Sequence, residues 1–176
     1  MKYRKLGHTG LLVSEVALGS MQFGGKMNMG NLGQEDTTRM VRVALDHGIN
    51  LIDTADVYSL GESETLLGNA LKGIRQEIVL ATKVRLPMSE NFNRSGATRV
   101  NILREVDGSL ARLQTEYIDL YQVHGWDSIL RWKRPCARST ISCARGRSAT
   151  SVSPISWRGR RPPRSGCRSA WGWRDS

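Results

Sequence analysis

The stretch GINLIDTADVYSLGESETLLGNALKG, residues 48–73, decides the fold of this chain. A short apolar run at 51–52 leads directly to Asp53, and Tyr58 follows in a polar segment. From 62 to 71 the apolar residues then recur at the three- and four-residue spacing of a helix. A buried strand that ends in a polar residue and continues into a helix is the repeating unit of parallel α/β proteins.

The same unit recurs through the first 129 residues. An antiparallel hairpin is predicted around the turn His8-Thr9-Gly10, and a glycine-rich loop over 21–33. The first helix is expected to be capped by Asp36 or Thr37. Strands are predicted at 14–18, 50–53, 77–83 and 117–124, and helices at 36–45, 62–71 and 98–113. This alternation predicts parallel strands with right-handed crossovers, which both a closed barrel and an open doubly wound sheet satisfy.

Four residues with useful chemistry fall at or just after the ends of these predicted strands: Asp53, Tyr58, Lys83 and His124. In a parallel array the carboxyl ends of the strands share one rim, where such folds keep their catalytic residues. Each residue taken alone also has a structural interpretation, as a helix cap, a packing tyrosine, a solvated lysine or a hydrogen-bonded core histidine. Their joint position on one rim favours an active site.

These four side chains together predict proton transfer to an oxygen. An ammonium beside a phenol stabilises the phenolate, so Lys83 and Tyr58 are expected to form a proton donor. Asp53 would keep the lysine charged, and His124 would donate a hydrogen bond to a carbonyl oxygen. The arrangement suits reduction of a carbonyl group, with hydride from a cofactor because no side chain supplies one. Neither G-x-G-x-x-G nor G-x-x-x-x-G-K-[ST] occurs, so a nucleotide would bind another surface.

Four motifs resemble the aldo/keto reductase family: YRKLGHTGLLVSEVALGSMQFGG at 3–25, the stretch at 48–73, EIVLATKV at 77–84 and SLARLQTEYIDLYQVHGWD at 109–127. The resemblance implies an α/β fold, the N-terminal half of a (β/α)8 TIM barrel with an N-terminal β-hairpin. It also implies NADPH-dependent reduction of aldehydes or ketones to alcohols. Some members of the family act as potassium-channel β subunits. The alternative function is therefore a non-catalytic NADP-sensing module on the same fold.

The resemblance also implies roles for individual residues. The catalytic tetrad would be Asp53, Tyr58, Lys83 and His124, with Tyr58 as the general acid. Three residues of the first βα-loop would border the cofactor together with Asp53, and these are Gly19, Ser20 and Met21. Trp126 and the loop over 24–31 would line the substrate pocket. No metal is expected.

A different composition begins near residue 130. The net charge of the 176 residues is +10, but residues 130–176 hold eleven arginines and one lysine against a single acid, Asp175. All three cysteines also lie there, at 136, 143 and 167, in a spacing that matches no zinc pattern, so free thiols are expected. We therefore divide the chain into a half-barrel over 1–129 and a disordered basic tail over 130–176.

A shifted reading frame accounts for this tail. Residues 132–157 have a possible coding sequence whose frame one nucleotide upstream reads VEETLRALDDLVRAGQVRYIGVSNIL, an amphipathic helix, a glycine turn and a strand ending in Ser-Asn. The family has these elements at this point, so the hypothesis is that 130–176 are out of frame. Resequencing the DNA for residues 128–132 tests it. A basic segment that binds nucleic acid is the alternative, with arginines on phosphates and tryptophans on bases.

The sequence shows neither a signal region nor a membrane span, and this bears on where the protein is expected to act. The start, MKYRKLGHTG, has no apolar signal region, and no run reaches the roughly 18 apolar residues of a membrane span. A cytoplasmic protein is therefore expected, with a small carbonyl compound as its partner rather than a membrane or a nucleic acid.

Overall fold

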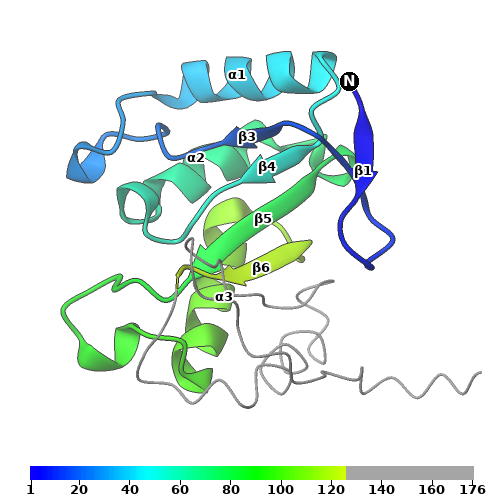
Figure 1. The fold of residues 1–176 in the computed structure, drawn as a ribbon. Coiled ribbons are helices and arrows are strands. Elements are labelled where there is room, and N and C mark those ends of the chain that lie inside the picture. The colour runs from blue at the N-terminus through cyan, green and yellow to red at the C-terminus, as the bar shows by residue number, and fades with distance from the viewer. Residues whose placement is uncertain (126–176) are drawn as a thin grey trace, which may run out of the picture.

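The computed structural model describes residues 1–125, and its centre is a four-stranded parallel sheet (Figure 1). The strands lie in the order of the sequence: β3 (Ala17–Gly19), β4 (Leu51–Asp53), β5 (Val79–Val84) and β6 (Leu120–Val123). Each neighbouring pair is parallel, with Gly19 opposite Asp53 and Asp53 opposite Ala81. All the carboxyl ends therefore meet at one edge of the sheet.

A separate hairpin, β1 (Tyr3–Lys5) paired antiparallel with β2 (Leu12–Ser14), lies at the opposite edge. Asn50, which precedes β4, fixes it there, because its side chain accepts from the Ser14 amide at 2.8 Å and donates to the Leu12 carbonyl at 3.0 Å. The predicted hairpin is confirmed. The first parallel strand starts later than predicted, since Ser14 pairs within the hairpin and its hydroxyl bonds the Val16 carbonyl at 2.6 Å.

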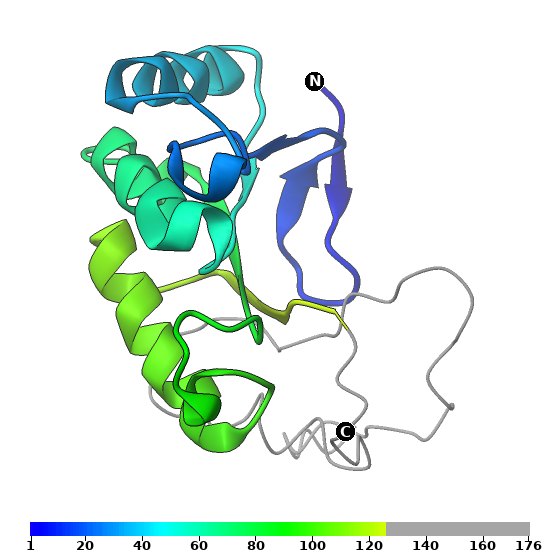
Figure 2. The same cartoon turned by 90° about the vertical axis from the view of Figure 1, so that its left-hand side faces the viewer.

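Three helices connect the parallel strands: α1 (Gln34–Asp46), α2 (Glu62–Ala70) and α3 (Arg99–Leu113). They lie side by side on one face of the sheet (Figure 2), with α2 between α1 and α3. Gly68 allows the approach of α2 to α3, because a Cβ there would lie 2.7 Å from the backbone of Arg112 and Leu113. Short 3-10 helices occupy Lys26–Asn28 (η1), Tyr58–Gly61 (η2), Arg75–Glu77 (η3) and Phe92–Arg94 (η4).

Helices α1 and α3 differ in how their N-termini are capped. Thr98 caps α3 as a threonine should, since its hydroxyl accepts from the Asn101 amide at 3.2 Å. The prediction that Asp36 or Thr37 caps α1 was wrong, because Gly33 is the cap and makes no side-chain bond. Asp36 lies in the first turn instead, where its charge stabilises the positive end of the helix.

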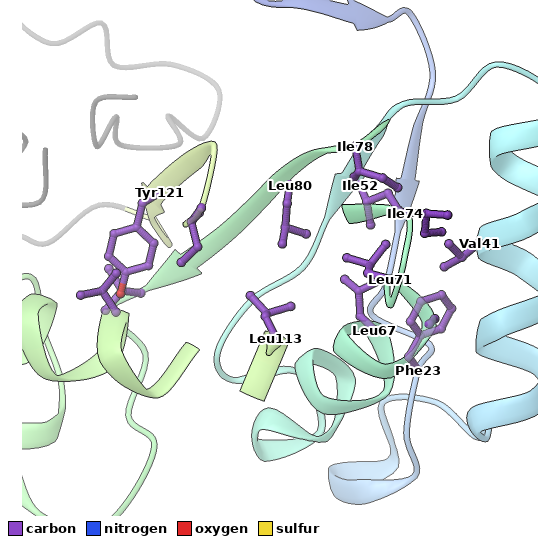
Figure 3. Packing of buried hydrophobic residues seen from close by; sticks show 14 of the residues in the cluster. Phe23, Val41, Ile52, Leu67, Leu71, Ile74, Ile78, Leu80, Leu113 and Tyr121 are labelled. Atoms are coloured by element: carbon purple, nitrogen blue, oxygen red, sulfur yellow. The ribbon is translucent and has the colours of Figure 1, made fainter. Parts of the chain in front are cut away.

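The core lies between the sheet and the helices (Figure 3). Alternate strand residues face it, among them Ile52, Leu80 and Tyr121, each fully buried. The helices supply the opposing surface, including Val41, Leu67, Leu71 and Leu113. The residues between them along each strand, Asp53 and Lys83 among others, face the other side of the sheet.

This architecture is the N-terminal half of a βα-barrel with a hairpin at its base. A doubly wound sheet would carry helices on both faces, whereas the connecting helices here share one face and the strands keep sequence order. None of the helices in residues 1–125 has the length and apolar character needed to cross a membrane. The predicted boundary at residue 129, the predicted basic tail and Trp126 lie outside the described residues.

Candidate active site

The four residues predicted from strand ends lie together at the carboxyl edge of the sheet. Asp53 is the last residue of β4, and Tyr58 is the first residue of η2, which follows that strand. Lys83 lies near the end of β5, and His124 comes directly after β6, where its amide donates to the Val84 carbonyl at 2.8 Å. Three of the residues thus reach the rim because a strand ends at or beside them, and Tyr58 reaches it because η2 follows β4 closely.

Lys83 is the centre of this group. Its ammonium lies 2.5 Å from Asp53 Oδ2 and 3.4 Å from the hydroxyl of Tyr58. It also donates to the backbone carbonyl of Thr54 at 2.8 Å, a partner that the sequence pattern did not reveal. The lysine side chain is only 5% exposed, against 35% for that of Asp53. The aspartate therefore compensates a nearly buried cation.

Tyr58 and His124 lie edge to face above this ion pair. Their ring centroids are 5.8 Å apart with planes at 82°. The pKa of His124 is lowered, chiefly by burial and then by the charge of Lys83, with Asp53 opposing both. Arg85 adds to the lowering and also donates to the backbone carbonyl of His124 at 3.2 Å. The imidazole is consequently neutral at neutral pH, so one of its nitrogens carries a proton that it can donate.

The predicted cofactor residues lie beside Asp53. Gly19 ends β3 opposite Asp53 and is exposed, with no atom within 4 Å of where a Cβ would be. Met21 is 47% exposed on the same rim. Ser20 differs, because it is fully buried and its hydroxyl accepts from that of Ser63 at 3.0 Å. Its backbone is also engaged, because the amide donates to the Asp53 carbonyl at 2.9 Å and the carbonyl accepts from the Ser63 hydroxyl at 2.8 Å, so Ser20 fixes the loop beside Asp53 from within.

The loop over 24–31, predicted to border the substrate, packs against the segment that carries Tyr58. The Gly25 amide donates to Glu62 Oε2 at 3.2 Å, and the hydroxyl of Ser59 donates to the Phe23 carbonyl at 3.2 Å. Phe23 anchors the loop because its side chain is fully buried in the core. This loop therefore flanks the same rim.

A second group of charged residues lies behind the rim, on the helix side of the sheet. Asp56 is fully buried, and neither of its side-chain oxygens has a hydrogen-bond partner among residues 1–125. Burial raises the pKa of Asp56 from 3.8 to about 8, and the carboxylates of Glu64 and Glu105 add to this against the opposing charge of Arg112. Sequence reasoning missed this group, since a polar residue in a short loop gives no signal of burial.

The group behind the rim is not a metal site by its geometry. Within the described part of the chain, no set of three or more His, Cys, Asp or Glu side chains could hold a metal ion. Glu64 is engaged instead by Arg112 at 2.7 Å and by the hydroxyl of Thr82 at 2.6 Å. The groups that the rim brings together are an ammonium, a phenol, a carboxylate and an imidazole.

This fold corresponds to that of a known class of oxidoreductase. The family model "Aldo/keto reductase family" matches residues 15–142. The chain therefore belongs to the aldo/keto reductase family, and the family resemblance expected from its motifs is confirmed.

Individual relatives agree with this assignment. Aldo-keto reductase YhdN of Bacillus subtilis is 43% identical over 132 residues, which cover 74% of this chain and 40% of that protein. Versiconal hemiacetal acetate reductase of Aspergillus parasiticus is 38% identical over 148 residues, covering 72% of this chain and 43% of that protein. The solved structure of aldo-keto reductase AKR11C1 from Bacillus halodurans in its holo form matches with a TM-score of 0.74 and 35% identity, over 87% of this chain and 50% of that one. The chain thus spans half or less of the length of these relatives.

Proposed function

We propose that this protein reduces aldehydes or ketones to alcohols with NADPH, and that Tyr58 gives the carbonyl oxygen its proton. One observation carries the proposal: a single buried ammonium, that of Lys83, contacts both the hydroxyl of Tyr58 and the carboxylate of Asp53. The family of the chain supports the oxidoreductase class, and one relative is named as a reductase of a hemiacetal acetate.

The residues of the chain would act in a fixed order. The neutral imidazole of His124 donates a hydrogen bond to the carbonyl oxygen and orients it toward Tyr58. As the carbonyl bond breaks, its electron pair moves to the oxygen, which takes the proton of the Tyr58 hydroxyl. Lys83 then stabilises the phenolate that remains, while Asp53 keeps Lys83 charged.

The rim fits a nicotinamide cofactor. Gly19 leaves open space directly beside Asp53, and Met21 offers an exposed apolar surface next to it. We propose that Gly19, Met21 and Asp53 hold the nicotinamide end, and that the buried Ser20 keeps the loop between Gly19 and Met21 in place. When bound, NADPH supplies a hydride to the carbonyl carbon. The related structure from Bacillus halodurans is described as a holo form, which supports a bound cofactor in this family.

We further propose the parts and surroundings of the protein from its sequence. Residues 1–129 would form the half-barrel, and 130–176 would be an out-of-frame tail. The substrate would be a small carbonyl compound that contacts Trp126 and the 24–31 loop. The location is proposed to be cytoplasmic.

The test compares two proteins side by side, the 176-residue chain and a version whose reading frame is restored after residue 129. NADPH oxidation is followed by absorbance with a panel of aldehydes and ketones. We expect turnover in the restored protein and little in the 176-residue chain. The restored form with Tyr58→Phe serves as the control for the proton donor.

Three other outcomes would change the proposal. Turnover in both proteins would mean that half a barrel suffices for cofactor binding. Cofactor binding without turnover in the restored protein would favour the non-catalytic sensing module. Activity that survives Tyr58→Phe undiminished would refute the role of Tyr58.

A further inference from the structure

The backbone directly after Tyr58 has an unusual conformation. Ser59, Leu60 and Gly61 have φ angles of 49°, 53° and 86°, so three consecutive residues are left-handed. For residues with a Cβ this conformation costs roughly 1–2 kcal/mol each. Such a turn persists only where its surroundings hold it, and strain of this kind collects at functional sites.

Contacts on the helix side of the sheet hold this turn. Ser59 is fully buried, with its hydroxyl on the Phe23 carbonyl. At Gly61 an added Cβ would lie 2.6 Å from Cδ and 2.9 Å from Nε of Arg112. The arginine side chain of α3 therefore lies directly against the backbone of the turn, in space that only a glycine leaves open.

Arg112 is itself fixed by a chain of hydrogen bonds that leads into the buried side chain of Glu64. Its Nε donates to Glu64 Oε2 at 2.7 Å, and Glu64 Oε1 accepts from the hydroxyl of Thr82 at 2.6 Å. The Glu64 side chain has no exposed surface, and Thr82 directly precedes Lys83 in β5. One continuous set of contacts thus connects the turn after Tyr58 with the strand that carries Lys83.

We propose that Arg112 is a positioning residue for the phenol of Tyr58, acting through the backbone of Gly61 from the helix side of the sheet. The proposal rests on the proposed function in so far as Tyr58 is the proton donor. Arg112 acts from outside the rim, because its side chain donates hydrogen bonds to Glu64 and Ser109 on the helix side of the sheet. Its effect on catalysis is therefore indirect.

The test uses two glycines that share a left-handed backbone. Gly61→Ala and Gly73→Ala both add a Cβ at a positive φ, 86° and 79° respectively, at opposite ends of α2. Only the first meets Arg112, because nothing lies within 4 Å of a Cβ at Gly73. The difference between the two variants therefore isolates the arginine contact from the strain itself.

The readout is the position of the Tyr58 ring, observed by NMR on the 176-residue chain without cofactor. The chain has three histidines, so the His124 ring proton is assigned by its loss in His124→Asn. Its chemical shift senses the ring current of Tyr58, whose ring lies 5.8 Å away. We expect Gly61→Ala to move this signal toward its position in Tyr58→Leu, and Gly73→Ala to leave it in place.

A second pair of variants carries the test if Gly61→Ala fails to fold. Arg112→Lys keeps the charge beside Glu64 but loses the guanidinium, and Arg104→Lys makes the same exchange at an exposed position of α3. We expect only Arg112→Lys to move the His124 signal. In the frame-restored protein it should also lower kcat while KM stays unchanged. The proposal would be overturned if the two variants of each pair moved the His124 signal equally, or if neither moved it. If the signal moves as expected but the frame-restored protein shows no NADPH turnover, the proposal holds and only the proposed function fails.

Discussion

Replacing Asp56 by asparagine should make the stability of this protein less dependent on pH. Asp56 is fully buried without a hydrogen-bond partner, and its pKa is raised from 3.8 to about 8. Between these two values the folded protein holds a proton that the unfolded chain has released. Stability is then greatest below the lower value and falls as the pH rises through the folded pKa.

The size of this effect follows from the linkage relation. One bound proton of difference lowers the free energy of unfolding by about 1.4 kcal/mol for each pH unit within the window. Over the whole window the loss reaches about 6 kcal/mol as an upper bound, against a typical total of about 5–15 kcal/mol for a domain. Asparagine stays neutral throughout, so Asp56→Asn should be the more stable protein above pH 7.

Urea unfolding at several pH values from 4.5 to about 8.5 measures this slope directly. Asp46→Asn, which removes an exposed carboxyl from α1, is the matched control. We expect the curve of stability against pH to flatten in Asp56→Asn and not in Asp46→Asn, because only Asp56 is buried. Parallel curves for the parent and Asp56→Asn would refute the reasoning and mean that Asp56 finds a partner in solution.

Three further predictions concern the rim and the core. Tyr58→Phe should lower kcat of the frame-restored protein by about 10²–10⁴-fold in NADPH oxidation, as loss of a general acid does; a smaller loss would point to another proton donor. Lys83→Met should raise the pKa of His124, since the lysine charge is one cause of its lowering, and an NMR titration of the His124 ring proton measures this; an unchanged or lower pKa would contradict it. Leu80→Ala should reduce the unfolding free energy by about 2–5 kcal/mol, whereas Leu12→Ala, at a position 56% exposed, should change it by less than about 1 kcal/mol; equal losses in urea melts would contradict the core described above.

Much of the fold could be predicted from the sequence because the apolar residues that recur with helix or strand spacing are the ones buried in the core. The helix over Arg99–Leu113 begins within one residue of its predicted start, and β4 ends at Asp53 as predicted. The start of α1 was mispredicted since acidic and threonine residues suit both a cap and a first turn, and local preference does not distinguish the two. The first strand was placed too early because Ser14 has a pairing partner in the hairpin that periodicity cannot reveal.

The candidate site divides in the same way. Its four rim residues could be found because each lies near or after the end of a strand, and parallel strands bring their ends together. The left-handed backbone at Ser59 and Leu60 could not, because neither residue type favours it and tertiary contacts impose it. The burial of Asp56 was equally hidden, since it depends on α2 and α3 packing over a loop that looks solvated in sequence.

The alternation of side chains along β5 and β6 also determines how this scaffold can be altered. Tyr121 and Val123 pack toward the helices, whereas Leu120 and Gln122 face the side of Lys83, with Gln122 opposite Lys83 in the register. Neighbouring positions in one strand can therefore be changed independently, because they face opposite sides of the sheet. A library that varies only Leu120 and Gln122 changes the face that carries Lys83 without disturbing the packed layer. One confined to Tyr121 and Val123 changes the packed layer, and with it the thermal stability, without altering that face.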